Sequence, residues 1–106
     1  MTIIRGGETK VREKILELSK KEKDKGLKVG VLTVDENKES YGDYEVISIG
    51  SKEDSNQAAH NLFDALREFD KLMVDVIYAE AISENYLGLA VMNRMKKAAG
   101  FNIIEV

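Results

Sequence analysis

The sequence predicts an α/β fold in which a five-stranded, mostly parallel sheet carries helices on both faces. Segments whose hydrophobic residues recur every three to four positions alternate along the chain with short apolar, β-branched runs. The run KVGVLTV at 28–34 is apolar at almost every position, which is typical of a strand covered on both faces. The alternation gives the order β-α-β-β-α-β-α-β and predicts a Rossmann-like three-layer sandwich.

The chain begins with a strand over 2–5, which two glycines end. A helix is expected over 8–25, with Gly26 in the position of a C-terminal helix glycine. Three apolar residues share one face of this helix: Val11, Ile15 and Leu18.

After the strand at 28–34, the polar segment 35–43 is expected to form a loop, and 44–49 a further strand. Either Ser51 or Asp54 can cap the next helix, which continues to about residue 71. Its expected buried stripe is Ala59, Leu62, Phe63, Leu66 and Phe69.

A strand over 74–79 precedes a third helix, which Ser83 or Asn85 can cap and which ends at Ala99. Apolar residues surround most of this helix, so it is expected to be deeply buried: Leu87, Leu89, Ala90, Val91, Met92 and Met95. A last strand occupies 102–106.

The predicted strand order in the sheet is 3-2-1-4-5. Right-handed crossovers then place the first helix on one face and the other two helices on the opposite face. No repeat or internal boundary divides residues 1–106, so one domain is expected.

Composition limits the classes of function. The formal net charge is −3 and no basic cluster is present, so no direct contact with nucleic acid is expected. The absence of cysteine excludes disulfides, thiolate metal sites and cysteine nucleophiles. No apolar run is long enough to span a membrane, and a cytoplasmic protein is expected.

Ligands of open α/β sheets bind beyond the carboxyl ends of the strands, which makes that end the place to look for a site. Five residues there are candidate ligand-binding positions: Gly6, Gly7, Gly50, Ser51 and Glu80. The glycine pair at 6–7 could hold a phosphate or form a plain turn, and the dinucleotide fingerprint is missing.

Three acidic residues in the 35–43 loop could bind a hard cation or be a solvated acidic loop: Asp35, Glu36 and Glu39. The single histidine, His60, is expected to be a partly exposed helix residue. No catalytic residue and no metal ligand are therefore assigned.

Polar residues flank the apolar stripes of the second half of the chain. They could pair with one another or form a polar face that docks on another domain: Arg67, Asp70, Glu80, Asn93 and Arg94.

Three blocks of the second half resemble the C-terminal accessory domain of two-domain, YrdC-containing L-threonylcarbamoyladenylate synthases. Residues 58–70 are similar to the family helix A-x-x-L-F-x-x-L-R-x-x-D, and the strand VDVIYAE at 74–80 continues the resemblance. Residues 88–99 are similar to the signature G-L-A-x-x-x-R-x-x-K-A-A. The first half matches only in its layout of a strand, a helix and a KVGVL-type strand.

The resemblance implies a non-catalytic accessory or regulatory domain acting in threonylcarbamoyladenosine modification of tRNA. The family's YrdC-like domain, normally in the same chain, uses ATP, threonine, bicarbonate and magnesium to make threonylcarbamoyl-AMP. That domain has no counterpart here, so no catalytic residue carries over. Six signature positions carry over as domain-interface or structural residues: Arg67, Asp70, Gly88, Asn93, Arg94 and Lys97.

Two further functions remain open. A free-standing nucleotide or small-ligand module would need a loop that grips phosphate, for which only the 6–7 glycine pair is available. An oligomerisation module would expose a large apolar patch.

Overall fold

Five strands form one sheet in the computed structural model, which describes residues 1–42, 44–82 and 87–106. The elements in chain order are β1 (Thr2–Arg5), α1 (Glu8–Asp24), β2 (Val29–Thr33), the 3₁₀ helix η1 (Lys38–Tyr41), β3 (Glu45–Ser48), α2 (Ser55–Leu72), β4 (Val76–Glu80), α3 (Leu87–Ala98) and β5 (Ile103–Glu105). Each pair of neighbouring strands is parallel. The predicted Rossmann-like α/β sandwich is confirmed.

The strand order is β3-β2-β4-β1-β5, so the predicted order 3-2-1-4-5 is wrong. β4 lies between β2 and β1, and Tyr78 is the partner of both Val31 and Thr2. Both orders satisfy right-handed crossovers, so handedness could not distinguish them. In the observed order α2 packs over β2, where Gly30 leaves room for the Phe69 ring.

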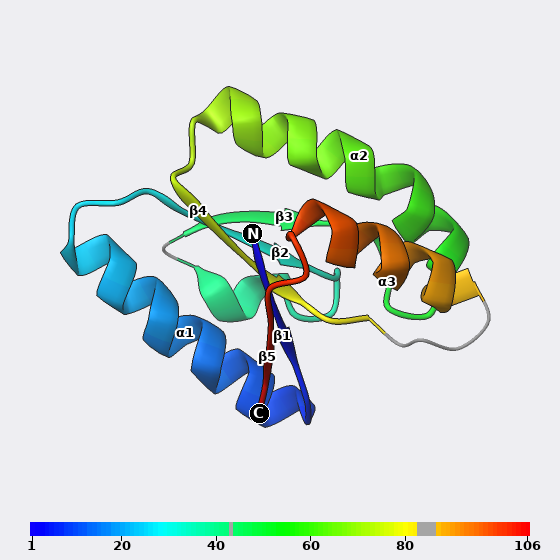
Figure 1. Cartoon of the computed structure of the whole chain (residues 1–106), viewed down its shortest axis with the longest axis horizontal. Helices are drawn as coiled ribbons and strands as arrows, with labels where there is room; N and C mark the ends of the chain where they lie inside the picture. Colours follow the sequence, from blue (N-terminus) through cyan, green and yellow to red (C-terminus); the bar gives the residue numbers. More distant parts are fainter. Residues whose placement is uncertain (43, 83–86) are drawn as a thin grey trace.

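The two helical layers lie as predicted. Figure 1 shows α1 on one face of the sheet and α2 with α3 on the other. Side chains of β2 alternate between the layers: Val31 packs in the cluster with Ile15 of α1, and Leu32 packs with Leu62 of α2. All five residues of β2 are buried, which confirms the prediction of a strand covered on both faces.

α1 buries Val11 and Ile15 against the sheet, and Leu18 is partly buried beside them. The helix ends as expected: Gly26 has a φ of +85°, and its N–H donates to the carbonyl of Lys23 at 2.9 Å.

α2 begins after Asp54, whose side chain accepts the N–H of Gln57 at 3.0 Å, so the second of the two predicted caps is used. Its buried stripe is Ala58, Leu62, Ala65 and Phe69. Phe63, predicted to be in the stripe, is 53% exposed, because one residue turns the helix by about 100°.

α3 faces the sheet on one side and α2 on another, and it buries Val91, Met92 and Met95 completely. The prediction that this helix is buried around most of its circumference is wrong, because Leu89 is 45% exposed and Ala90 is exposed. The proposed caps Ser83 and Asn85 lie outside the described residues.

The segment predicted as a polar loop contains η1, which brings Tyr41 into the α1-side core with no exposed surface. Among the described helices, none combines the length and the apolar character that crossing a membrane requires.

Candidate functional site

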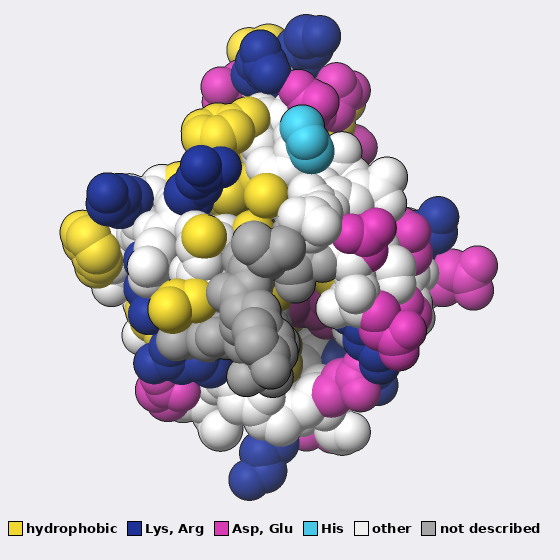
Figure 2. Space-filling view, turned by 90° about the vertical axis from the view of Figure 1, so that its right-hand side faces the viewer, with side chains coloured by type: hydrophobic (Ala, Val, Ile, Leu, Met, Phe, Trp, Pro, Cys, Tyr) yellow, Lys and Arg dark blue, Asp and Glu magenta, His cyan; other side chains and the backbone are white. Residues whose placement is uncertain are grey.

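A pocket of about 420 Å³ opens at the carboxyl ends of β2 and β4. The chain leaves β2 toward η1 and leaves β4 toward α3, on opposite faces of the sheet, which is the arrangement that opens a crevice in α/β folds. Its lining residues are Gly6, Glu8, Val11, Val34, Asn37, Lys52, Glu53, Glu80, Ala81 and Ile82. Figure 2 views this end of the molecule, with most acidic side chains on its right half and hydrophobic and basic ones on its left.

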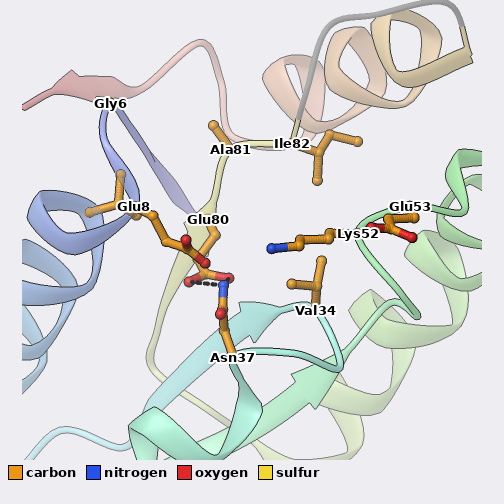
Figure 3. Close-up of a pocket in the computed structure, with 10 residues that line it drawn as sticks. Gly6, Glu8, Val34, Asn37, Lys52, Glu53, Glu80, Ala81 and Ile82 are labelled. Carbon is orange, nitrogen blue, oxygen red and sulfur yellow. Dashed lines mark hydrogen bonds between the residues drawn. The ribbon is translucent and has the colours of Figure 1, made fainter.

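Glu80 is the buried carboxylate of the pocket, with 7% of its surface exposed. Thr33 Oγ1 donates to Oε1, and the Tyr41 hydroxyl donates to Oε2 at 2.7 Å. Asn37 Nδ2 lies 3.3 Å from both oxygens. Figure 3 shows the Asn37 side chain pointing at the Glu80 carboxylate, with the hydrogen bonding dashed. A carboxylate has about four acceptor positions, so all of those on Glu80 are occupied by this chain.

These bonds explain how a charge is held in the interior. Three donors from β2, η1 and the turn between them compensate the desolvation of the Glu80 carboxylate. In turn, Glu80 fixes η1 to the end of β4. Burial, and then the hydrogen bond to Glu80, raises the pKa of Tyr41 far above its usual value.

The remaining polar lining combines both signs of charge. Glu8, Lys52 and Glu53 are exposed, and Figure 3 shows the Lys52 side chain extending into the pocket toward Asn37. Val11 and Val34 form apolar walls, and they are buried. Such a lining could accept a small molecule that carries charged groups on an apolar body.

The glycine pair serves the fold. Gly6 lines the pocket, but its φ is +151° and a Cβ there would lie 2.4 Å from the Val106 carbonyl oxygen. Gly6 is therefore required by the packing of the last residue. Gly7 is the N-cap of α1 and does not line the pocket. These contacts favour the plain-turn interpretation over phosphate binding.

Gly50 and Ser51 connect the loops beside the pocket without lining it. The Gly50 carbonyl accepts the N–H of Asp35 at 2.9 Å. Ser51 Oγ donates to Glu36 Oε2 at 2.6 Å, and the Lys52 N–H donates to Oε1 at 3.0 Å. The hydrogen bond from Ser51, and after it the one from the Lys52 N–H, hold the pKa of Glu36 below its usual value.

Two acidic residues of the loop after β2, Asp35 and Glu36, accept hydrogen bonds from serines near the end of β3. Asp35 accepts a hydrogen bond from Ser48 Oγ at 2.6 Å, and Glu39 is exposed. In the part of the chain that the structure describes, no three His, Cys, Asp or Glu side chains gather as metal ligands. His60 is exposed on α2, in agreement with the prediction of a partly exposed helix residue.

The family-signature residues lie on the outer surface of α2 and α3: Arg67, Asp70, Asn93, Arg94 and Lys97 are exposed. Arg67 pairs with Asp64 at 2.7 Å. The Arg94 guanidinium lies 5.8 Å from the centre of the Phe63 ring. Gly88 is in the first turn of α3, and its surroundings lie outside the described part.

The polar residues flanking the apolar stripes do not pair with one another among the described residues. Glu80 binds Thr33, Asn37 and Tyr41. Sequence reasoning named Glu80 but missed Asn37 and Tyr41, because both stand in a polar stretch without periodicity. A lone tyrosine after a buried strand was the available signal.

Comparison with known proteins supplies an independent test of the resemblance. Residues 1–100 match the family model described as threonylcarbamoyl-AMP synthase, C-terminal domain. The chain is 47% identical over 104 residues to the threonylcarbamoyl-AMP synthase of Pyrococcus abyssi, covering 98% of this chain and 29% of that protein. It is 41% identical over 93 residues to the Bacillus subtilis enzyme, covering 88% of this chain and 27% of that protein.

Two solved structures are similar to this chain in fold as well as in sequence. The crystal structure of P. abyssi Sua5 complexed with L-threonine superposes with a TM-score of 0.84 at 44% identity, over 99% of this chain and 29% of that one. The crystal structure of the C-terminal Sua5 domain from Pyrococcus horikoshii gives 0.77 at 43% identity, over 99% of this chain and 94% of that one. The chain thus spans less than a third of the curated relatives above.

Proposed function

The chain belongs to the family of threonylcarbamoyl-AMP synthase C-terminal domains, and on that premise we propose that residues 1–106 form an accessory domain without chemistry of its own. The domain supports a YrdC-like catalytic domain, which uses ATP, threonine, bicarbonate and magnesium to make threonylcarbamoyl-AMP for tRNA modification. Its contribution is regulatory: it favours the conformation in which the catalytic domain turns over.

One observation carries this proposal. Glu80 is the buried carboxylate at the carboxyl end of the sheet. Its oxygens accept hydrogen bonds from Thr33, Asn37 and Tyr41. A general base needs a free acceptor position within reach of its substrate. The place where an α/β fold would perform chemistry is used here to hold the loops together.

A domain exchange with the Pyrococcus abyssi relative tests the proposal. Three proteins are compared: the intact synthase, the synthase truncated before the region aligned with this chain, and the truncated synthase fused to this chain. Each is supplied with ATP, L-threonine, bicarbonate and magnesium, and pyrophosphate release is measured. We expect the fusion to recover most of the activity that truncation removes.

Two controls make the exchange decisive. The isolated chain should release no pyrophosphate above the protein-free background, and measurable turnover by it would overturn the non-catalytic assignment. A fusion to an unrelated folded domain of similar length should stay as inactive as the truncated enzyme. If both fusions recover equally, the effect is not specific and the accessory role is wrong.

The pocket favours one second candidate, a small-ligand module, because about 420 Å³ lies within the usual range of small-molecule sites. Titration of ATP into isotopically labelled chain, followed through backbone amide shifts, separates the two candidates. Localised shifts at Gly6, Ser51 or Glu80 would support the module. Unchanged spectra at millimolar ATP would support the accessory domain.

A further inference from the structure

Two large apolar residues have a left-handed backbone conformation and also expose most of their side chains to solvent. Met73 follows α2 with a φ of +57°, and Phe101 follows α3 with a φ of +61°. Their side chains are 79% and 68% exposed. The left-handed conformation strains any residue with a Cβ, and glycine or asparagine is the usual occupant at the end of a helix.

The two residues lie at one end of the molecule. In a parallel sheet, each crossover helix ends where the next strand begins, so the turns into β4 and β5 share the amino-terminal edge. β1 lies between β4 and β5 in the sheet. The Ile3 N–H donates to the Asn102 carbonyl at 2.9 Å, which places the turn containing Phe101 beside the start of β1.

The N terminus therefore emerges between these two turns. Figure 1 shows it between the start of β4, which follows α2, and the turn from α3 into β5. Neighbouring strands are about 4.8 Å apart, so β4 and β5, which flank β1, are separated by about 10 Å. Met73 and Phe101 precede these two strands by three and two residues. Met73 and Phe101 can thus contact one partner together.

We propose that Met73 and Phe101 form a docking surface for the portion of a threonylcarbamoyl-AMP synthase that precedes this domain in the longer relatives. This inference rests on the proposed function. The chain aligns with 29% of the Pyrococcus abyssi protein, and the matching family model describes a C-terminal domain, so the remainder of the relative comes before it. That remainder therefore connects to the domain at the β1 end, where the turns that contain Met73 and Phe101 also lie.

A docking role accounts for large apolar residues at these two strained, left-handed positions. A segment attached at β1 is held at high effective concentration over both turns, so modest apolar contacts suffice to close the interface. Burial of the methionine and phenylalanine side chains against that segment would favour the docked state. Asparagine at either position would relieve the backbone strain and lose this contact.

The groove between α2 and α3 is a weaker candidate. It has a volume of about 350 Å³ and is lined by Leu62, Phe63, Leu66, Arg94, Lys97 and Ala98. Its residues have ordinary helical geometry, and the Arg94 guanidinium already lies over the Phe63 ring. The groove therefore supplies the matched control for the test.

Methionine oxidation measures the predicted contact directly. The chain has four methionines, and Met92 and Met95 are completely buried. Peroxide oxidation of the isolated chain is compared, by mass spectrometry, with oxidation of the fusion to the preceding part of the Pyrococcus abyssi synthase. We expect Met73 to oxidise about tenfold more slowly in the fusion, since oxidation follows exposure. Equal rates at Met73 in the two proteins would overturn the inference.

Substitution separates docking from folding. In the isolated chain, Met73→Asn and Phe101→Asn should leave the midpoint of thermal unfolding unchanged or raise it, because asparagine tolerates the left-handed conformation. Each should weaken binding of the isolated chain to the separately produced preceding part about tenfold, as calorimetry measures. Phe63→Asn, which also removes an exposed aromatic ring, should leave that affinity within about twofold.

The outcomes separate this inference from the proposed function. If the wild-type chain restores activity in the fusion while Met73→Asn and Phe101→Asn bind normally, the docking surface is wrong and the accessory role stands. If Phe63→Asn alone weakens binding, the partner docks on the helical layer, which also overturns the inference. If the wild-type chain neither binds nor restores activity, both proposals fail.

Discussion

Replacement of Tyr41 by phenylalanine isolates one hydrogen bond of the buried network. The hydroxyl donates to Glu80 Oε2 at 2.7 Å, and both side chains are buried. Tyr41→Phe keeps the ring and removes only the donor, so the carboxylate loses one of its compensating bonds. A hydrogen bond to a charged group contributes a net stabilisation of about 1.5–3 kcal/mol.

The expected loss is large for a chain of 106 residues. One kcal/mol changes the melting temperature of a domain near this size by about 4–8 °C, so Tyr41→Phe should lower it by about 10 °C. Urea unfolding monitored by circular dichroism gives the free energy directly. The surface variant Arg67→Ala is the matched control: it also removes a donor 2.7 Å from a carboxylate, on exposed Asp64, and should change stability little.

Alkaline pH provides a second test of the same bond. The folded-state pKa of Tyr41 is raised above the ordinary value of 10.0. Below that value the phenol is protonated in both states, so its contribution to stability is complete. Above it, only the unfolded chain releases the proton, and stability falls by about 1.4 kcal/mol per pH unit.

Tyr41→Phe should flatten this alkaline loss of stability. A smaller slope should remain, because burial also raises the pKa of Tyr78. A variant as stable as the wild type at neutral pH, with an unchanged alkaline slope, would show that the hydroxyl does not bond a buried carboxylate, and the structural role given to Glu80 would be wrong.

Three smaller changes test other parts of the structure. Gly30→Ala should cost about 1–3 kcal/mol in urea unfolding, because the new Cβ would lie 2.5 Å from the Phe69 ring. Asp54→Ala removes the cap of α2 and should lower the free energy of unfolding by about 1 kcal/mol. Ser51→Ala should raise the pKa of Glu36 toward its usual value, which carboxyl NMR titration measures.

Two of these substitutions have a matched control. Gly42→Ala should be tolerated, because no atom lies within 4 Å of the Cβ position there. Glu53→Ala, one residue before the cap, should leave α2 unaffected. Equal effects of cap and control substitutions would indicate that α2 begins differently. An unchanged Glu36 pKa in Ser51→Ala would indicate that the Ser51 hydroxyl bonds elsewhere.

The fold class was predictable because local patterns reflect burial. The continuous apolar run of β2 requires cover on both faces, and the spacing of Val11 and Ile15 requires one buried helical face. Gly26 marked the end of α1 because a left-handed residue is needed there. Each of these features depends on a few adjacent residues, so the sequence alone contains the information.

The remaining features depend on residues that are distant in sequence. The position of β4 between β2 and β1 depends on pairing between strands that are far apart in sequence, such as Thr2 with Tyr78, which no local pattern reveals. Tyr41 lies in a polar stretch, and only Glu80, 39 residues away, explains its burial. Phe63 fits the apolar stripe of α2 by type, but which of the neighbours Leu62 and Phe63 faces the core is decided by how the helix packs on the sheet.

The position of β1 in the sheet has a consequence for synthesis of the protein. Both neighbours of β1 come from the last third of the chain, since Thr2 pairs with Tyr78 and Ile3 with Ile103. At translation rates of about 5–20 residues per second, the first strand waits roughly 4–15 s for β4 and roughly 5–20 s for β5. A chain cut before β4 would retain an apolar first strand without either of its partners. Completion of the sheet around β1 therefore requires residues of this domain up to Glu105.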